Sequence, residues 1–146
     1  HIILNPSPMD QQVLDCPVKQ VDYIILNEIE AAEICGLVGK IKDEQLAGKL
    51  AESFPHTKVI LTLGEKGALY LEKGNIIRQE SFHVPVVDTT AAGDTFTGYF
   101  FGSILSGMKP ETALQRAATA AAIAVTKKGA APSIPEALEV DGFFSE

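Results

Sequence analysis

The chain has 146 residues, 46% of them hydrophobic, and a formal net charge of −7. This length allows one domain with a sizeable core, and the acidic balance argues against nucleic-acid binding through phosphate neutralisation unless the 12 Lys and Arg residues cluster. No stretch approaches the roughly 20 apolar residues of a membrane span and no basic-then-apolar signal opens the chain, so we expect a cytoplasmic protein with an α/β core.

Apolar runs typical of buried strands alternate along the chain with segments of helical periodicity. Strands are expected at residues 2–5, 23–26, 58–63, 68–72 and 76–84, a short helix or turn at 11–16, and helices at 28–35, 43–54, 89–108, 110–125 and 135–144. Pro6 and Pro8 end the first strand, and Asp43 is expected to cap the helix that follows it. Cys16 and Cys35 lack the spacing of a zinc site, which favours free, buried thiols.

This alternation predicts an α/β fold with a Rossmann-like, mainly parallel sheet flanked by helices. Lys73-Gly74-Asn75 adds a turn signal that predicts an antiparallel hairpin at the sheet edge. Ligands of such sheets bind beyond the carboxyl ends of the strands. Asn27 and Gly64 each directly follow a predicted strand, and Asp88 follows the hairpin, so we expect these positions to mark the site.

The most informative segment is Asp88-Thr-Thr-Ala-Ala-Gly-Asp94, which precedes a long apolar helix. The first N–H groups of a helix have no partner inside it and carry partial positive charge. Because Ala91, Ala92 and Gly93 have almost no side chain, a phosphate can approach these N–H groups. Asp94 beside that anion suits a general base better than a phosphate ligand. The alternative is an ordinary helix start that a Thr or Asp side chain caps.

This segment resembles the second signature of the ribokinase-like (PfkB) sugar kinases, D-T-x-x-A-G-D-x-F, which it matches from Asp88 through Phe96. Residues 27–30 have that family's N-x-x-E form, and residues 62–67 have its T-L-G-x-x-G form. Residues 120–135 are similar to the ribokinase branch of the family. All four segments occur in family order, which makes the resemblance specific.

The resemblance implies that residues 1–146 are the C-terminal, nucleotide-binding portion of a larger chain. Members of the family also have an N-terminal half, with a G-G-x-x-x-N sugar-binding segment and a β-sheet lid, and this sequence contains neither. Most of the sugar specificity would then lie in the absent half. The resemblance also implies that the full-length protein is a homodimer.

The resemblance further implies a role for individual residues. Asp94 would be the catalytic base, with an anion hole formed by Ala91, Ala92 and Gly93. The nucleotide-binding residues would be Asn27, Thr62, Leu63, Gly64, Glu65, Lys66, Gly67, Gly93, Asp94 and Ala118. Glu30 would hold Mg²⁺ through its waters. A monovalent cation, K⁺, would bind Asp88, the carbonyls of Thr90, Ala124, Lys127 and Gly129, and Ser133.

Each assignment has a structural alternative. Asn27 and Glu30 fit a capping box, and residues 62–67 fit a tight turn in which Lys66 is simply solvated. Asp88 fits a turn cap, and residues 127–133 fit a plain loop. Ala118 stands where some ribokinases have a His near the adenine, which leaves base selectivity open.

The implied activity is ATP-dependent phosphorylation of a sugar hydroxyl, with ribose as the expected sugar. ATP and a small sugar would be the partners of the chain, and neither nucleic acid nor a membrane would be. Fructose, deoxyribose and nucleoside kinases of the same family are alternatives. So is a nucleotide-binding module without catalysis, because the lid that closes the site is missing from this sequence.

Overall fold

The computed structural model describes residues 1–7 and 9–143. Pro8, expected to end the first strand, and Phe144, the last residue of the expected terminal helix, lie outside the described residues. The chain divides into two compact units. The first unit comprises His1–Gly64 and Ala68–Arg78, and the second comprises Glu65–Gly67 and Gln79–Glu146.

Five strands form one sheet in the order β1-β2-β3-β4-β5. They are β1 (Ile3–Leu4), β2 (Tyr23–Asn27), β3 (Lys58–Thr62), β4 (Ala68–Glu72) and β5 (Asn75–Gln79). β1 pairs with β2 and β2 with β3 in parallel, whereas β3 and β4 are antiparallel. Between β4 and β5, Lys73 and Gly74 have φ angles of 49° and 82°, the left-handed pair of a tight two-residue hairpin. The predicted sheet with an edge hairpin is therefore confirmed.

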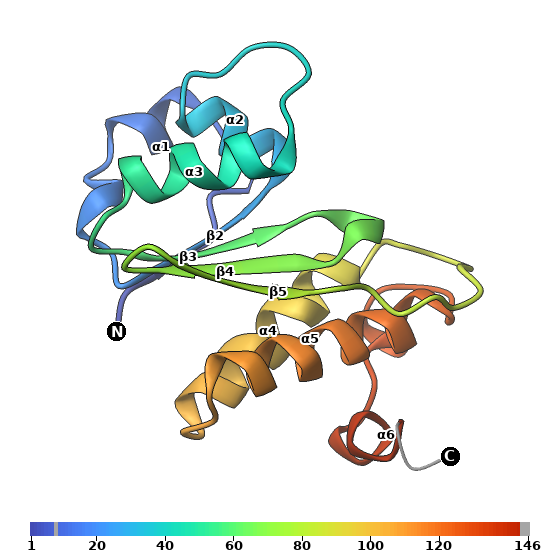
Figure 1. Ribbon diagram of the computed structural model, residues 1–146. Helices are drawn as coiled ribbons and strands as arrows, with labels where there is room; N and C mark the ends of the chain where they lie inside the picture. Colours follow the sequence, from blue (N-terminus) through green and yellow to red (C-terminus); the bar gives the residue numbers. More distant parts are fainter. Residues whose placement is uncertain (8, 144–146) are drawn as a thin grey trace. The chain divides into compact units, whose positions relative to one another are not determined.

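Three helices lie over one face of this sheet in the first unit (Figure 1). They are α1 (Gln11–Asp15), α2 (Glu28–Ile34) and α3 (Asp43–Ser53), with a short 3-10 turn η1 (Val18–Gln20) between α1 and β2. Alternate side chains of β2, Ile24 and Leu26, join Leu46 and Leu50 of α3 in the core. The period of two residues along the strand therefore directs these side chains toward the helices.

The start of α3 differs from the sequence prediction. Lys42, not Asp43, is the N-cap residue, and Asp43 is the first residue of the helix. The Lys42 N–H donates to the side-chain Oε1 of Gln45 at 3.4 Å. The carboxylate of Asp43 lies in the first turn, where the helix dipole favours negative charge.

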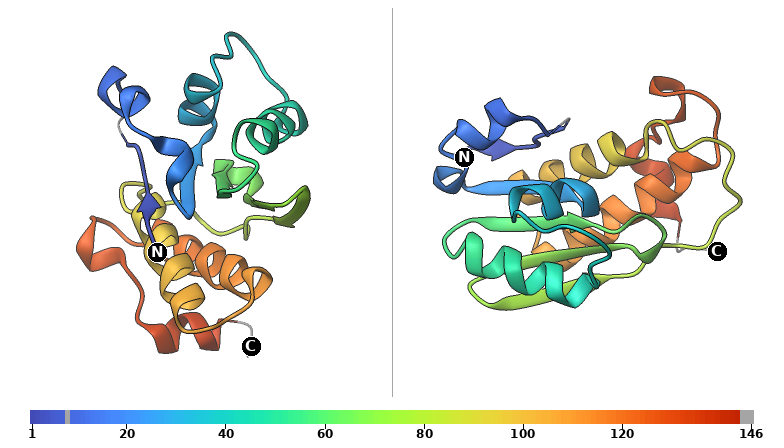
Figure 2. Two further views of the ribbon diagram at one scale, coloured as in Figure 1. Left: turned by 90° about the vertical axis from the view of Figure 1, so that its left-hand side faces the viewer. Right: turned by 90° about the horizontal axis from the view of Figure 1, so that it is seen from above.

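The second unit is built on α4 (Ala92–Leu105) and α5 (Pro110–Val125), which pack side by side (Figure 2). Phe100 and Leu114 are fully buried, and Phe96 and Phe101 are nearly so. Tyr99 is only half-buried and donates its hydroxyl to the carbonyl of Pro135 at 2.7 Å.

α4 is shorter at both ends than the predicted helix 89–108. At its C-terminus Gly107 has a φ of 83°, and the N–H groups of Gly107 and Met108 donate to the carbonyls of Ile104 and Ser103. This left-handed glycine ends the helix in the way that a Schellman motif does. β5 likewise stops at Gln79, short of the predicted strand end at residue 84.

The C-terminal segment forms η3 (Ala131–Ser133) and α6 (Ala137–Gly142). Two ion pairs tie α6 to the rest of the second unit. Arg116 of α5 pairs with Asp141, and the Nζ of Lys127 lies 2.8 Å from the Oε1 of Glu139.

Both cysteines are free, as predicted, but Cys16 is exposed and Cys35 is half-buried. The expected burial of Cys16, which is the C-cap residue of the short helix α1, is therefore wrong. Burial raises the pKa of the Cys35 thiol. Within the described part of the chain, every helix is too short or too polar to cross a membrane.

Candidate functional site

The predicted phosphate-binding segment leads into the N-terminus of α4. Ala91 is the N-cap residue, and no side chain among the described residues caps this helix. Ala92 donates its N–H to the carbonyl of Thr89 at 3.1 Å. Helix geometry leaves the N–H groups of Gly93 and Asp94 without a partner inside the helix. The alternative of a side-chain-capped helix start is therefore wrong, and Gly93 and Asp94 keep donors for an anion.

The surroundings of these donors suit a phosphate. Gly93 and Asp94 are exposed, and Ala91 and Ala92 contribute only methyl groups. Asp94 is the acidic residue of the first turn, so its carboxylate lies near any anion that the helix N-terminus binds. A carboxylate in that place can accept a proton from an attacking hydroxyl.

Asp88 ties the loop before α4 to the loop after α5. Its Oδ1 accepts hydrogen bonds from the N–H and the hydroxyl of Thr90 at 3.0 and 2.6 Å, and its Oδ2 accepts one from the Gly129 N–H at 3.0 Å. The N–H groups of Val87 and Asp88 donate to the carbonyl of Val125. These hydrogen bonds, chiefly that from the Thr90 hydroxyl, lower the pKa of Asp88 to about 2. Asp88 therefore caps this turn, as the structural alternative to a cation ligand expected.

Apart from Thr90, which precedes α4, the other predicted cation ligands lie at the C-terminus of α5 and in the loop after it. The carbonyl of Ala124 accepts the Lys127 N–H at 3.0 Å, and the buried hydroxyl of Ser133 donates to the carbonyl of Ala130 at 2.7 Å. Residues 1–7 and 9–143 contain no cluster of three or more His, Cys, Asp or Glu side chains suited to a metal ion. A cation here would depend on one carboxylate and neutral oxygens, which suits a monovalent ion. The Ser133 hydroxyl, which donates to Ala130, keeps its lone pairs for such an ion.

In the first unit, Asn27 and Glu30 form the predicted capping box at the start of α2. The Oδ1 of Asn27 accepts hydrogen bonds from the N–H groups of Ile29 and Glu30, each at 2.9 Å. The Oε2 of Glu30 accepts the Asn27 N–H at 2.9 Å, and Glu30 is buried. Asn27 itself is exposed, so its side-chain NH₂ group can reach a ligand.

Asn27 and Thr62 pair in register at the carboxyl ends of β2 and β3, as expected of site residues in a parallel sheet. The Thr62 hydroxyl donates to the carbonyl of Leu26 at 3.3 Å. Leu63 is buried, so its backbone and not its side chain is available to a ligand.

The 3-10 turn η2 (Gly64–Lys66) then leads to Gly67, which confirms the predicted tight turn. Gly67 has a φ of 94°, and a Cβ there would overlap the carbonyl of Gln79. The carbonyl of Glu65 accepts a hydrogen bond from the Ser81 hydroxyl. Glu65 and Lys66 are exposed.

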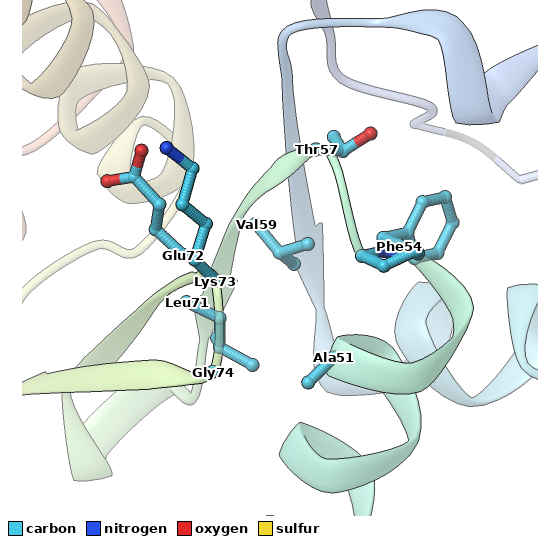
Figure 3. A pocket seen from close by; sticks show the side chains of 9 residues that line it. Ala51, Phe54, Thr57, Val59, Leu71, Glu72, Lys73 and Gly74 are labelled. Atoms are coloured by element: carbon cyan, nitrogen blue, oxygen red, sulfur yellow. The ribbon is translucent and has the colours of Figure 1, made fainter.

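Two hollows differ in what they could hold. The hollow in Figure 3 has a volume of about 20 Å³ and is lined by Ala51, Phe54, Val59 and Leu71, with room for about one water. None of the predicted site residues in the described part of the chain lines it.

Ala118, predicted near the nucleotide base, is buried in α5.

A larger groove, of about 500 Å³, runs along α4 in the second unit. Asp94, Thr95, Gly98, Gly102 and Ser106 line it, and we call it the α4 groove. The sequence analysis did not predict this groove. The available signal was the recurrence of small residues at every fourth position, 98, 102 and 106.

The comparisons with known proteins identify the family. The sequence pattern of the pfkB family carbohydrate kinases matches residues 1–137. The chain therefore belongs to the pfkB family of carbohydrate kinases. It is 42% identical over 147 residues to the ribokinase of Haemophilus influenzae, covering 98% of this chain and 47% of that protein. It is 38% identical to the ribokinase of Schizosaccharomyces pombe, covering 99% of this chain and 46% of that one.

Solved structures agree with this assignment. A ribokinase from Cryptococcus neoformans in complex with ADP matches with a TM-score of 0.85 and 31% identity, over 97% of this chain and 50% of that one. An Arabidopsis thaliana ribokinase with ribose and ATP matches with a TM-score of 0.82 and 33% identity, over 94% and 45%. A putative ribokinase II from E. coli with ATP and Mg²⁺ has a TM-score of 0.76 and 26% identity, over 97% and 47%. The chain thus has the ribokinase-like fold and spans about half the length of these proteins.

Proposed function

We propose that this chain carries the ATP site and the catalytic base of a kinase that phosphorylates a sugar hydroxyl, with ribose as the sugar. The observation that carries the proposal is the uncapped N-terminus of α4, with small residues before it and Asp94 in its first turn. The similarity to ribokinases supports ribose, and one similar structure is described with ribose and ATP.

In the proposed reaction, Asp94 accepts the proton of a primary sugar hydroxyl as its oxygen attacks the γ-phosphorus of ATP. The new bond joins the sugar oxygen to phosphorus, and the bond from phosphorus to the bridging oxygen breaks, so that ADP leaves. Charge on the transferring group is stabilised by the N–H groups of Gly93 and Asp94. The Ala92 N–H, which donates to Thr89, would have to leave that carbonyl before it could contribute.

Two cations belong to this proposal. Mg²⁺ bound to the ATP phosphates would neutralise their charge, and Glu30 would reach it only through water because Glu30 is buried and caps α2. K⁺ would be held by Asp88, the carbonyls of Thr90, Ala124, Lys127 and Gly129, and the Ser133 hydroxyl. Such a bound cation would hold the loop before α4 in place electrostatically.

We propose the nucleotide-binding residues for each unit separately. In the first unit, Asn27, Thr62 and Gly64 would contact phosphate at the ends of β2 and β3. In the second unit, residues 65–67 would lie near the ribose and base of ATP. Lys66 is one of these residues, but we do not propose it as a catalytic group.

The test uses a chimera in which this chain replaces the matching part of the H. influenzae ribokinase. We expect ribose-dependent ADP formation, and Asp94→Asn should lower kcat by about 10²–10⁴-fold while ATP affinity changes less than about tenfold. Asp43→Asn is the matched control, because Asp43 is also an acidic first-turn residue and should leave kcat unchanged. An inactive chimera, or an Asp94→Asn variant with more than a tenth of the parent turnover, would contradict the proposal.

The 146-residue chain alone should not phosphorylate ribose. Phosphoryl transfer requires the hydroxyl to be held within about 3–3.5 Å of the phosphorus with water excluded, and we expect the sugar-binding segment and lid of the family to supply both conditions.

A further inference from the structure

The short helix α6 is attached to the second unit by several contacts of its own. Val140 of α6 is 2% exposed, and Arg116 of α5 pairs with Asp141. Just before α6, the carbonyl of Pro135 accepts the hydroxyl of Tyr99 at 2.7 Å. A helix of 6 residues is not stable by itself in water, so these contacts hold it in place. The helix therefore presents its other side chains at defined positions.

The carboxylate of Glu139 in α6 has two partners. Its Oε2 accepts the N–H of Glu136 at 2.9 Å, which caps the start of α6. Its Oε1 accepts a hydrogen bond from the Nζ of Lys127 at 2.8 Å. The capping interaction orients the carboxylate within its own helix. Exposed ion pairs add little to stability, and both side chains of this pair are at least one-third exposed. The pair can, however, determine where Lys127 lies.

Lys127 begins the loop that holds Asp88. The N–H of Lys127 donates to the carbonyl of Ala124 at the end of α5, at 3.0 Å. Two residues later, the N–H of Gly129 donates to the Oδ2 of Asp88, also at 3.0 Å. Gly129 has a φ of 93°, which residues with a Cβ rarely adopt. The hydrogen bond to Asp88 thus depends on a sharp turn directly after Lys127.

The other oxygen of Asp88 holds the segment that enters α4. Its Oδ1 accepts the N–H and the hydroxyl of Thr90 at 3.0 and 2.6 Å. Thr90 is followed by Ala91, the N-cap residue of α4. The N–H groups of Gly93 and Asp94, proposed to bind the transferring phosphoryl group, come next. A short series of hydrogen bonds therefore connects α6 to the proposed anion site.

We propose that Glu139 is a positioning residue for phosphoryl transfer. Through Lys127 it keeps the loop after α5 in the conformation that holds Asp88, and so sets the position of the anion-binding N–H groups. The inference rests on the proposed function, because it concerns the same site. A misplacement of about 1 Å can lower a rate about 10²-fold. The phosphate contacts proposed in the first unit do not involve α6, so ATP binding should change less than turnover.

The alternative is that the pair only helps to attach α6. The pair of Arg116 and Asp141 provides the comparison, because it joins the same helix to the middle of α5. Both pairs contribute to the attachment of α6, whereas only the pair of Lys127 and Glu139 includes a residue of the loop.

The first experiment measures ribose phosphorylation by the chimera with the rest of the H. influenzae ribokinase, at one KCl concentration. Glu139→Gln should lower kcat about tenfold, with the KM for ATP within about threefold of the parent value. Glutamine removes the charge but keeps an oxygen for the capping box, as Gln45 does in α3. Asp141→Asn is the matched control and should leave kcat within about twofold of the parent.

Variants of Lys127 test the pair itself. Lys127→Met should lower kcat as Glu139→Gln does, although it keeps the backbone carbonyl proposed to bind K⁺. The double variant should be no slower than either single variant, because both substitutions remove the same interaction. Lys127→Arg preserves the pair and should retain the parent kcat.

The second experiment needs no activity. Amide hydrogen exchange in the 146-residue chain is followed by NMR at Gly129 and Thr90, whose N–H groups both donate to Asp88. Glu139→Gln should accelerate exchange at both positions several-fold, and Asp141→Asn should not.

A Glu139→Gln chimera with the parent kcat, or an equal loss of kcat in Asp141→Asn, would overturn the proposal. So would unchanged exchange at Gly129 and Thr90 in Glu139→Gln. An inactive parent chimera would instead contradict the proposed function, and the exchange rates would then test the link from Glu139 to Asp88 independently.

Discussion

Asn27 has two roles to separate, the observed cap of α2 and the proposed contact with phosphate. Asn27→Ala removes the acceptor of the Ile29 and Glu30 N–H groups, which should destabilise the protein by about 1 kcal/mol. With an unfolding entropy of roughly 2.1 cal/mol/K per residue over 146 residues, this corresponds to a melting temperature about 3 °C lower. Asn27→Ser keeps an oxygen that can cap the helix, so its melting temperature should lie within about 1 °C of the wild type.

The two variants should nevertheless bind nucleotide alike. Only the amide of Asn27 can donate two hydrogen bonds to phosphate while its oxygen caps the helix, and serine lacks that NH₂ group. Calorimetric titration of the chain with Mg·ATP should therefore show weaker binding for both variants, beside melting curves followed by circular dichroism. If Asn27→Ser binds ATP as the wild type does, Asn27 is a cap and nothing more. If Asn27→Ala has the same melting temperature as the wild type, the stability attributed to the capping box is wrong.

Two further predictions concern Asp88. K⁺ should raise the melting temperature of the chain more than Na⁺ does at equal ionic strength, because an ion that binds only the folded state stabilises it. The Asp88→Ala variant should show no difference between the two ions. An identical response of the wild type to both ions would contradict the proposed cation site. Asp88 has a pKa of about 2 in the folded chain and about 3.9 when unfolded, so its stabilising effect is present above about pH 4 and is lost as the pH falls toward 2. The difference in urea midpoint between wild type and Asp88→Asn should therefore shrink over that window, and a difference that stays constant from pH 5 to pH 2 would contradict the assigned hydrogen bonds.

Local sequence signals were sufficient where neighbouring residues decide the conformation. β4 and α5 have the predicted bounds. An apolar run before a glycine turn determines where β4 lies, and an initial proline followed by an alanine-rich sequence determines where α5 begins. The capping box of Asn27 and Glu30 could likewise be predicted, because it joins two residues only three positions apart. The cap of α3 was predicted wrongly, because Lys42 and Asp43 are adjacent and a shift of one residue exchanges their roles.

The sequence by itself determined the order of strands and helices, the edge hairpin, and the motifs that identify a pfkB-family chain, because each depends on residues within a few positions of one another. Only the tertiary structure decided that Asp88 accepts a hydrogen bond from Gly129, 41 residues away, and that the buried hydroxyl of Thr95 has no hydrogen-bond partner among the described residues. It also showed that Gly98 and Gly102 have no positive φ angle, and that a Cβ at either position would meet no atom within 4 Å among the described residues. Spacing along a helix predicts which residues share a face, but what that face contacts depends on segments that are distant in the sequence.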